Sequence, residues 1–129
     1  MLDALAPARR RFVVGVLALA MMVDPSIAAP VLAQPSAPIA VTPGRAADLN
    51  LSPDDLAAVK ARAAAGCEVL GLRYRSDPMV GTRFATLSRE LGDAFLKVEF
   101  RGRQHATLTE HRQQEAVDRV LAFFAEKLR

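Results

Sequence analysis

The chain carries the apolar run CEVLGLRY at residues 67–74, with Gly66 before it and the turn-forming sequence SDP (76–78) after it. Segments with helical spacing lie on both sides of the run, which indicates a strand at about 68–74, buried between helices in a parallel sheet. A second strand is predicted at about 95–101, because apolar and charged residues alternate there with the period of a half-buried strand.

Three helices are expected around these two strands. The first begins with SPDD at 52–55, where the serine can cap the helix, the proline suits its first turn and the aspartates favour its positive end. The second, FATLSREL at 84–91, has its large apolar residues on one face and stops at Gly92. The third has apolar residues at helical spacing over 117–128.

The order helix, strand, helix, strand, helix predicts an α/β fold. The central strand–helix–strand unit is expected to close right-handed, so that its two strands are parallel. Two parallel strands are too few for an ordinary sheet, and residues 49–129 support only a small core. We therefore expect a partial doubly wound sheet of two parallel strands and about three helices, preceded by an apolar N-terminal helix and a disordered linker.

The first third of the chain has the pattern of an export signal. Three arginines at 9–11 precede FVVGVLALAMMV at 12–23, twelve residues without a charge, and small residues follow. A basic start, a short apolar centre and a small-residue exit are typical of a secretory signal peptide, and the apolar centre is shorter than the about 20 residues that span a bilayer. We expect residues 1–33 to be a signal peptide cleaved after Ala28 or Ala33, which exports the protein to the periplasm or the medium. An uncleaved membrane anchor is the alternative.

Residues 34–48, QPSAPIAVTPGRAAD, are predicted to form a linker. Pro35, Pro38 and Pro43 remove backbone donors, and no apolar period is present that a core could bury. The three segments expected are therefore a signal peptide at 1–33, a linker rich in proline and alanine at 34–48, and a partial α/β domain at 49–129.

Composition excludes several classes of protein. A hydrophobic content of 51% in 129 residues excludes a wholly disordered chain, and a single cysteine excludes an internal disulfide framework. The net charge of +3 comes from 17 basic and 14 acidic residues that are interspersed, so a basic patch for nucleic acid is not indicated. His105, Glu110 and His111 fit no zinc spacing, and the glycines form no phosphate loop, so no metal or cofactor is predicted.

Two residues with catalytic chemistry follow the predicted strands. Asp77 comes just after the first strand and His105 just after the second. Functional residues of open α/β sheets gather beyond the carboxyl ends of the strands, and neighbouring strands lie about 5 Å apart. An aspartate that accepts one imidazole N–H leaves the other nitrogen to act as a base. The alternatives are an ordinary Ser-Asp-Pro turn and a solvated loop histidine.

From about Leu51 to Leu128 the sequence resembles the C-terminal third of the dienelactone-hydrolase-like α/β hydrolases. The resemblance rests on five segments in order: LSPDDLAAVKAR, VLGLRYRSDPMV, RFATLSRELGDAF, HATLTEH and EAVDRVLAFFAEKL. It implies a mostly parallel sheet with helices on both faces, and a catalytic set of a serine or cysteine nucleophile, an acid and a histidine. Asp77 matches the acid and His105 the histidine. Arg103 and Gln104 stand where the family often has glycine beside the histidine.

The chain departs from this family at the nucleophile. The family places it on a sharp strand-to-helix turn of G-x-S-x-G or G-x-C-x-G type, and no such pentapeptide occurs here. Cys67 opens its strand, about 20 Å from the end that carries Asp77, and is interpreted as a buried small apolar residue. The resemblance therefore implies a truncated hydrolase that is inactive alone. The alternative is a small exported interaction protein. Either would self-associate or bind a protein that supplies the missing sheet, with no nucleic acid as partner.

Overall fold

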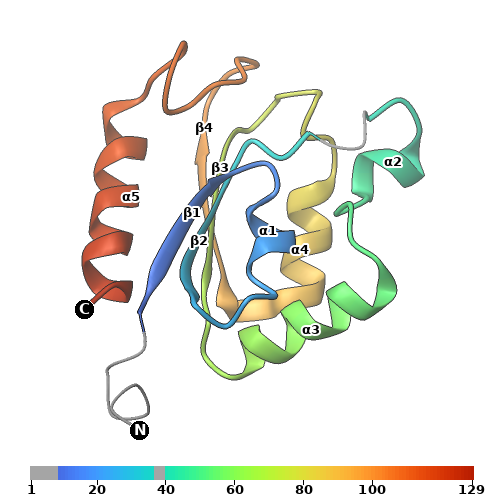
Figure 1. Ribbon diagram of the computed structural model, residues 1–129. Helices are drawn as coiled ribbons and strands as arrows, with labels where there is room; N and C mark the ends of the chain where they lie inside the picture. Colours follow the sequence, from blue (N-terminus) through green and yellow to red (C-terminus); the bar gives the residue numbers. More distant parts are fainter. Residues whose placement is uncertain (1–8, 37–39) are drawn as a thin grey trace, which may run out of the picture.

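The computed structural model describes residues 9–36 and 40–129 (Figure 1). Its centre is a sheet of four parallel strands in the order β1-β2-β3-β4. The strands are β1 (Arg11–Gly15), β2 (Ile27–Ala33), β3 (Val69–Tyr74) and β4 (Phe95–Phe100). All three neighbouring pairs are parallel, so the carboxyl ends of the strands lie along one end of the sheet.

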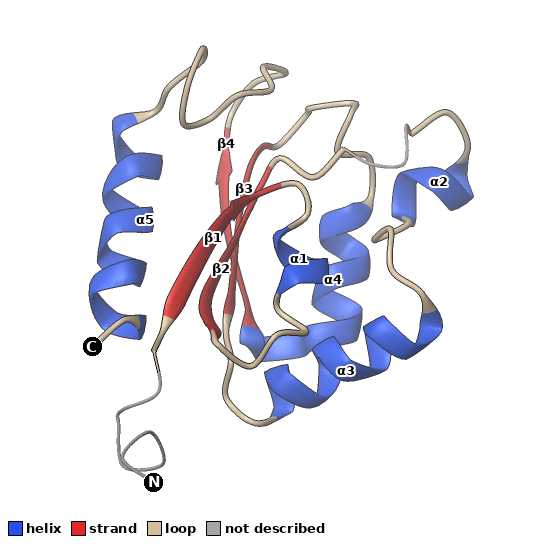
Figure 2. Ribbon diagram, viewed as in Figure 1, coloured by secondary structure: helices blue, strands red, loops and turns tan. Residues whose placement is uncertain are grey.

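Helices cover both faces of the sheet (Figure 2). On one face lie α1 (Ala18–Met21), α3 (Pro53–Ala64) and α4 (Arg83–Leu91), which ends in the 3-10 turn η2 (Gly92–Ala94). On the other face lies α5 (Gln114–Lys127), whose buried residues Ala116, Val120 and Phe123 pack on the sheet. The short helix α2 (Pro43–Ala47) lies beside α4. The general α/β prediction, with a parallel sheet covered on both faces, is thus confirmed.

The local signals at α3 work as the sequence predicts. The side chain of Ser52 accepts a hydrogen bond of 3.1 Å from the backbone N–H of Asp55, and Pro53 occupies the first turn. Gly66 follows the helix with a φ of 103°, a conformation that favours glycine. The helix therefore begins at a residue whose side chain caps a backbone N–H and is followed by a glycine that adopts a positive φ.

Packing between β3, β4 and α4 depends on a glycine. A Cβ built on Gly71 would lie 2.5 Å from Cε1 of Phe95, closer than such atoms approach in proteins. Phe95 and Phe84 fill this space with their rings edge to face, 5.1 Å between centroids. The glycine in the run 67–74 is thus a place where two aromatic rings approach the strand backbone.

The expectation of two strands after an apolar N-terminal helix is wrong. The charge-free segment 12–23 divides between β1, a turn and α1, and the small residues after it form β2. Val31 and Ala29 are fully buried in that strand. An apolar run long enough for a signal sequence can have the same composition as an edge strand followed by a short helix, and periodicity does not separate the two. The sheet therefore has four strands and the described chain five α-helices.

The expected linker 34–48 contains a short helix. Residues 37–39 lie outside the described residues, while 43–47 form α2 with the Thr42 side chain as its cap.

The strand β2 contains a proline, Pro30, which has no backbone N–H to donate. The strand tolerates it because the hydrogen-bonded ladder between β2 and β3 begins only at the next residue, Val31. Among the helices described, none combines the length and apolar character needed to cross a membrane.

Candidate functional site

Asp77 is held in place by the turn after β3. Its backbone N–H donates to the carbonyl of Tyr74 at 3.1 Å, and its Oδ1 accepts from the backbone N–H of Met79 at 2.9 Å. The side chain is only 1% exposed. The carboxylate is therefore buried with one oxygen already oriented by the backbone, which leaves Oδ2 for a second partner.

That partner is His105, from the loop after β4. Nδ1 of His105 lies 2.6 Å from Oδ2 of Asp77, and the imidazole is 35% exposed. An ionised carboxylate only accepts hydrogen bonds, so the contact places the proton on Nδ1 and leaves Nε2 as the nitrogen that can act as a base. The structure thus brings together the two residues that the sequence placed at the ends of neighbouring strands.

The loop that carries His105 is tied to β3 by backbone hydrogen bonds. The N–H of Arg75 donates to the carbonyl of Phe100 at 2.7 Å, and the N–H of Ser76 donates to the carbonyl of Gly102 at 3.0 Å. These bonds extend the β3–β4 pairing past the ends of both strands. They fix the distance between the turn of Asp77 and the start of the histidine loop.

Side chains that sequence reasoning missed hold the far part of the same loop. The hydroxyl of Tyr74 donates to the carbonyl of His111 and accepts from Nε2 of Gln113 at 3.1 Å. The hydroxyl of Thr107 donates to Oε1 of Gln34 at 2.9 Å, which connects the loop to the end of β2. Tyr74 is the single tyrosine and ends its strand, but no sequence signal pairs Gln34 with Thr107.

A buried arginine, Arg83, holds the residues that follow Asp77. Nη1 of Arg83 donates to the carbonyls of Met79 at 2.8 Å and Val80 at 3.1 Å. Its Nε donates to the carbonyl of Asp48 at 2.8 Å. The guanidinium thus links the segment after Asp77 to the segment around α2, and this anchor had no sequence signal either.

One of the arginines near the strand ends, Arg73, is paired with a carboxylate within the fold. Nε of Arg73 donates to Oε2 of Glu99 at 2.8 Å, and its guanidinium lies 4.4 Å from the ring centroid of Phe84. Arg75, Arg101 and Arg103 are exposed, on the turns and the strand end around the pair. Among these arginines, Arg73 thus lies within the fold and the other three lie at its surface.

The turn between β1 and α1 carries no side chain with a nucleophilic atom. β1 passes through Gly15, Val16 and Leu17 directly into α1, at the same end of the sheet as Asp77 and His105. A strand-to-helix turn of this kind carries the nucleophile in α/β hydrolases. Here it offers neither a hydroxyl nor a thiol.

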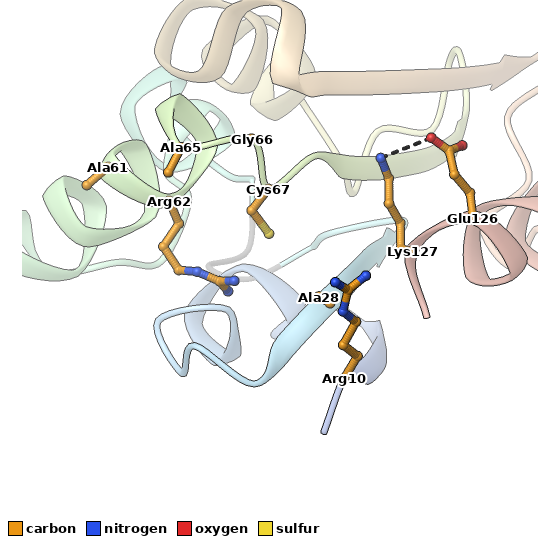
Figure 3. Close-up of a pocket in the computed structure, with 9 residues that line it drawn as sticks. All are labelled: Arg10, Ala28, Ala61, Arg62, Ala65, Gly66, Cys67, Glu126 and Lys127. Carbon is orange, nitrogen blue, oxygen red and sulfur yellow. Dashed lines mark hydrogen bonds and ion pairs between the residues drawn. The ribbon is translucent and has the colours of Figure 1, made fainter. Parts of the chain in front are cut away.

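Cys67 lies at the opposite end of the sheet, as its place before β3 predicts. With Arg62 and Lys127 it lines a pocket of about 520 Å³ at the amino ends of β2 and β3 (Figure 3). Burial raises the pKa of its thiol, and the neighbouring Arg62 and Lys127 only partly oppose this effect. The thiol is half-buried rather than fully buried. It is separated from Asp77 by the length of β3, so it cannot complete the Asp77–His105 pair.

Within the described ranges no three histidine, cysteine, aspartate or glutamate side chains gather as metal ligands would. The site is therefore a carboxylate–imidazole pair held by turns at the carboxyl ends of β3 and β4. No family model matches this chain, and neither a curated protein nor a solved structure matches it.

Proposed function

We propose that the chain is a dienelactone-hydrolase-like α/β hydrolase fragment that keeps the acid and the histidine and lacks the nucleophile. The observation that carries this proposal is the contact of 2.6 Å between Asp77 Oδ2 and His105 Nδ1 at the carboxyl ends of parallel strands. Its further support is the order of the parts, since a strand-to-helix turn precedes the acid and the acid precedes the histidine.

The pair alone supplies one part of acyl transfer. Nε2 of His105 can accept a proton from water as the water attacks a carbonyl, and Asp77 stabilises the imidazolium that forms. An acyl-enzyme needs an activated nucleophile, and its oxyanion needs preorganised donors. Because Val16 and Leu17 offer no nucleophile at the β1–α1 turn, the chain is expected to form no acyl-enzyme and to be inactive as an esterase by itself.

The test is hydrolysis of an activated ester, such as a nitrophenyl acetate, by the full chain and by its His105→Ala variant. We expect no burst of nitrophenol and equal rates for both proteins. A burst, or a turnover that His105→Ala abolishes, would show a complete active site and overturn the proposal. Circular dichroism of both proteins controls for folding.

Export is a separate proposal that rests on the sequence pattern at 9–33. Cleavage after Ala33 would remove β1, α1 and β2, and cleavage after Ala28 would remove β1, α1 and the first two residues of β2. The complete burial of Ala29 and Val31 favours a folded chain that keeps this segment. The intact mass of the protein from its native host distinguishes a cleaved chain from one that keeps this segment. A mature chain that begins at Ala29 or Gln34 would lack part of the four-stranded sheet.

A second candidate function is that of an interaction protein. The observation in its favour is the exposed apolar surface of β1, where Phe12 and Val14 face solvent. The coding sequence upstream of this chain distinguishes the two candidates. A segment with G-x-S-x-G or G-x-C-x-G there would favour a divided hydrolase, and its absence would favour the interaction protein.

A further inference from the structure

The two edges of the sheet differ in their protection against further pairing. β4, at one edge, carries Lys97 and Glu99, and charges of this kind discourage edge-to-edge association. β1, at the other edge, pairs only with β2 among the described strands and has Phe12 56% exposed and Val14 39% exposed. Its backbone therefore offers hydrogen-bonding groups along a strand whose side chains are apolar from residue 12 onward.

We propose that β1 pairs antiparallel with β1 of a second copy of this chain, around a two-fold axis at Val13. This pairing joins the two sheets into one continuous sheet of eight strands. A two-fold axis closes the assembly as a dimer, since each copy uses the same surface. The inference concerns an edge of the sheet remote from β3 and β4, so it does not rest on the proposed function of Asp77 and His105.

The charges of β1 disfavour registers whose axis lies nearer the N-terminus than Val13. With Val13 on the axis, Arg11 of each copy lies opposite Gly15 of the other, and Phe12 lies opposite Val14. Arg9 and Arg10 then extend along Leu17 and Val16 of the second copy instead of facing its arginines. An axis nearer the N-terminus would bring the arginines of the two copies together, and like charges directly opposite are destabilising. An aromatic residue opposite a β-branched one is a favourable cross-strand pair.

The face of the sheet that α5 covers is compatible with the same two-fold arrangement. A two-fold axis perpendicular to the sheet keeps α5 of both copies on one face, on either side of the paired β1 strands. Phe12 contacts Phe124 of α5, with ring centroids 4.5 Å apart. Leu121, one turn before Phe124, is 58% exposed on that side of the helix. The second copy would cover this surface, which a monomer leaves open to water.

A shallow pocket marks the uncovered side of α5. It has a volume of about 280 Å³ and is lined by Leu108, Arg112, Val117, Val120 and Leu121. Val117, Leu121 and Phe124 lie at helical spacing, so the pocket and the contact with Phe12 share one side of the helix. The apolar surface proposed for the dimer thus includes a strand edge and a helix side, which is more than a single strand could bury.

The first test is the mass of the full chain by light scattering over a dilution series. We expect twice the 13.9 kDa of one chain, and loss of the dimer in Val14→Lys, which places a cation opposite Phe12 of the other copy. Val41→Lys makes the same change at an exposed valine away from β1 and should remain dimeric. A wild-type monomer, or a dimer that survives Val14→Lys, would overturn the proposal.

The second test is disulfide formation in a Cys67→Ala background, which stays informative if Val14→Lys fails to fold. Cysteines at Val13 would face each other across the axis at a Cα separation of about 5 Å, which a disulfide spans. Cysteines that replace Arg11 would lie four residues out of register with each other, about 13 Å apart along the strands, which is too far for a disulfide. We expect Val13→Cys to link two chains on oxidation and Arg11→Cys to remain unlinked. Equal linking by both would contradict the proposed register, while His105→Ala should change neither result.

Discussion

Thr107 is fully buried and donates a hydrogen bond from Oγ1 to Oε1 of Gln34, 2.9 Å away. Gln34 follows β2 directly, with a φ of 36°, and its backbone N–H donates to the carbonyl of Leu72 in β3 at 2.8 Å. The end of β2 is thus connected to β3 through its backbone and to the histidine loop through its side chain. This connection makes the end of β2 and the first residue of the expected linker part of the support of the candidate site.

Thr107→Val tests that support. The substitution keeps the shape of the side chain and removes the hydroxyl, so Gln34 loses its donor and the chain should lose about 1 kcal/mol of unfolding free energy in urea. Amide exchange in the loop that carries His105 should accelerate. Thr109→Val, at an exposed position of the same loop, is the matched control and should leave both measurements unchanged.

Removal of residues 1–33 tests whether the N-terminal segment belongs to the fold. A chain that begins at Gln34 lacks β1, α1 and β2, which leaves the edge of β3 unpaired from Leu70 to Leu72. We expect this chain to aggregate and to show no cooperative thermal unfolding, in contrast to the full chain. A shortened protein that is monomeric and unfolds cooperatively would contradict the four-stranded sheet.

Gly71→Ala tests the packing of β3 against α4. The new Cβ would meet the ring of Phe95 at 2.5 Å, and the surrounding core must shift to accept it. Overpacking of this kind costs about 1–3 kcal/mol, which chemical unfolding would measure. Gly44→Ala is the control, because nothing lies within 4 Å of a Cβ there and alanine suits the helix α2.

The thiol of Cys67 should react slowly at neutral pH. Burial raises its pKa, so less of it is present as thiolate than in a free cysteine, and the thiolate is the reactive form. Alkylation by iodoacetamide should therefore be slower in the folded chain than in the same chain in urea. The difference should shrink as the pH rises through the raised pKa and the folded thiol ionises. Faster alkylation of the folded chain would contradict the assignment of Cys67 as a residue without catalytic use.

The C-terminal part of the fold was predictable because its signals are local. The run ending at Tyr74 and the alternating residues before Arg101 each have the period of a strand, and Ser52 and Gly66 close a helix by their own backbone chemistry. The Asp77–His105 contact followed from these strands, since parallel neighbours bring their carboxyl ends together.

The N-terminal part was not predictable from the same kind of signal. Basic residues followed by FVVGVLALAMMV have the composition of an export signal and also that of a strand and a helix. The strand joins the sheet by pairing with residues 27–32, a contact that local composition does not show. Gln34 and Thr107 were missed for a related reason. They are 73 residues apart, and their contact depends on where two loops meet in space.

The position of the proton on the His105 ring tests the central claim most directly. Nitrogen-15 correlation spectra of the neutral rings distinguish Nδ1–H from Nε2–H, and the chain contains two histidines, so exposed His111 is an internal reference. The contact with Asp77 predicts that His105 carries its proton on Nδ1, and that Asp77→Ala makes its spectrum resemble that of His111. A His105 ring that already resembles His111 in the unmodified protein, and that Asp77→Ala leaves unchanged, would contradict the acid–histidine pair.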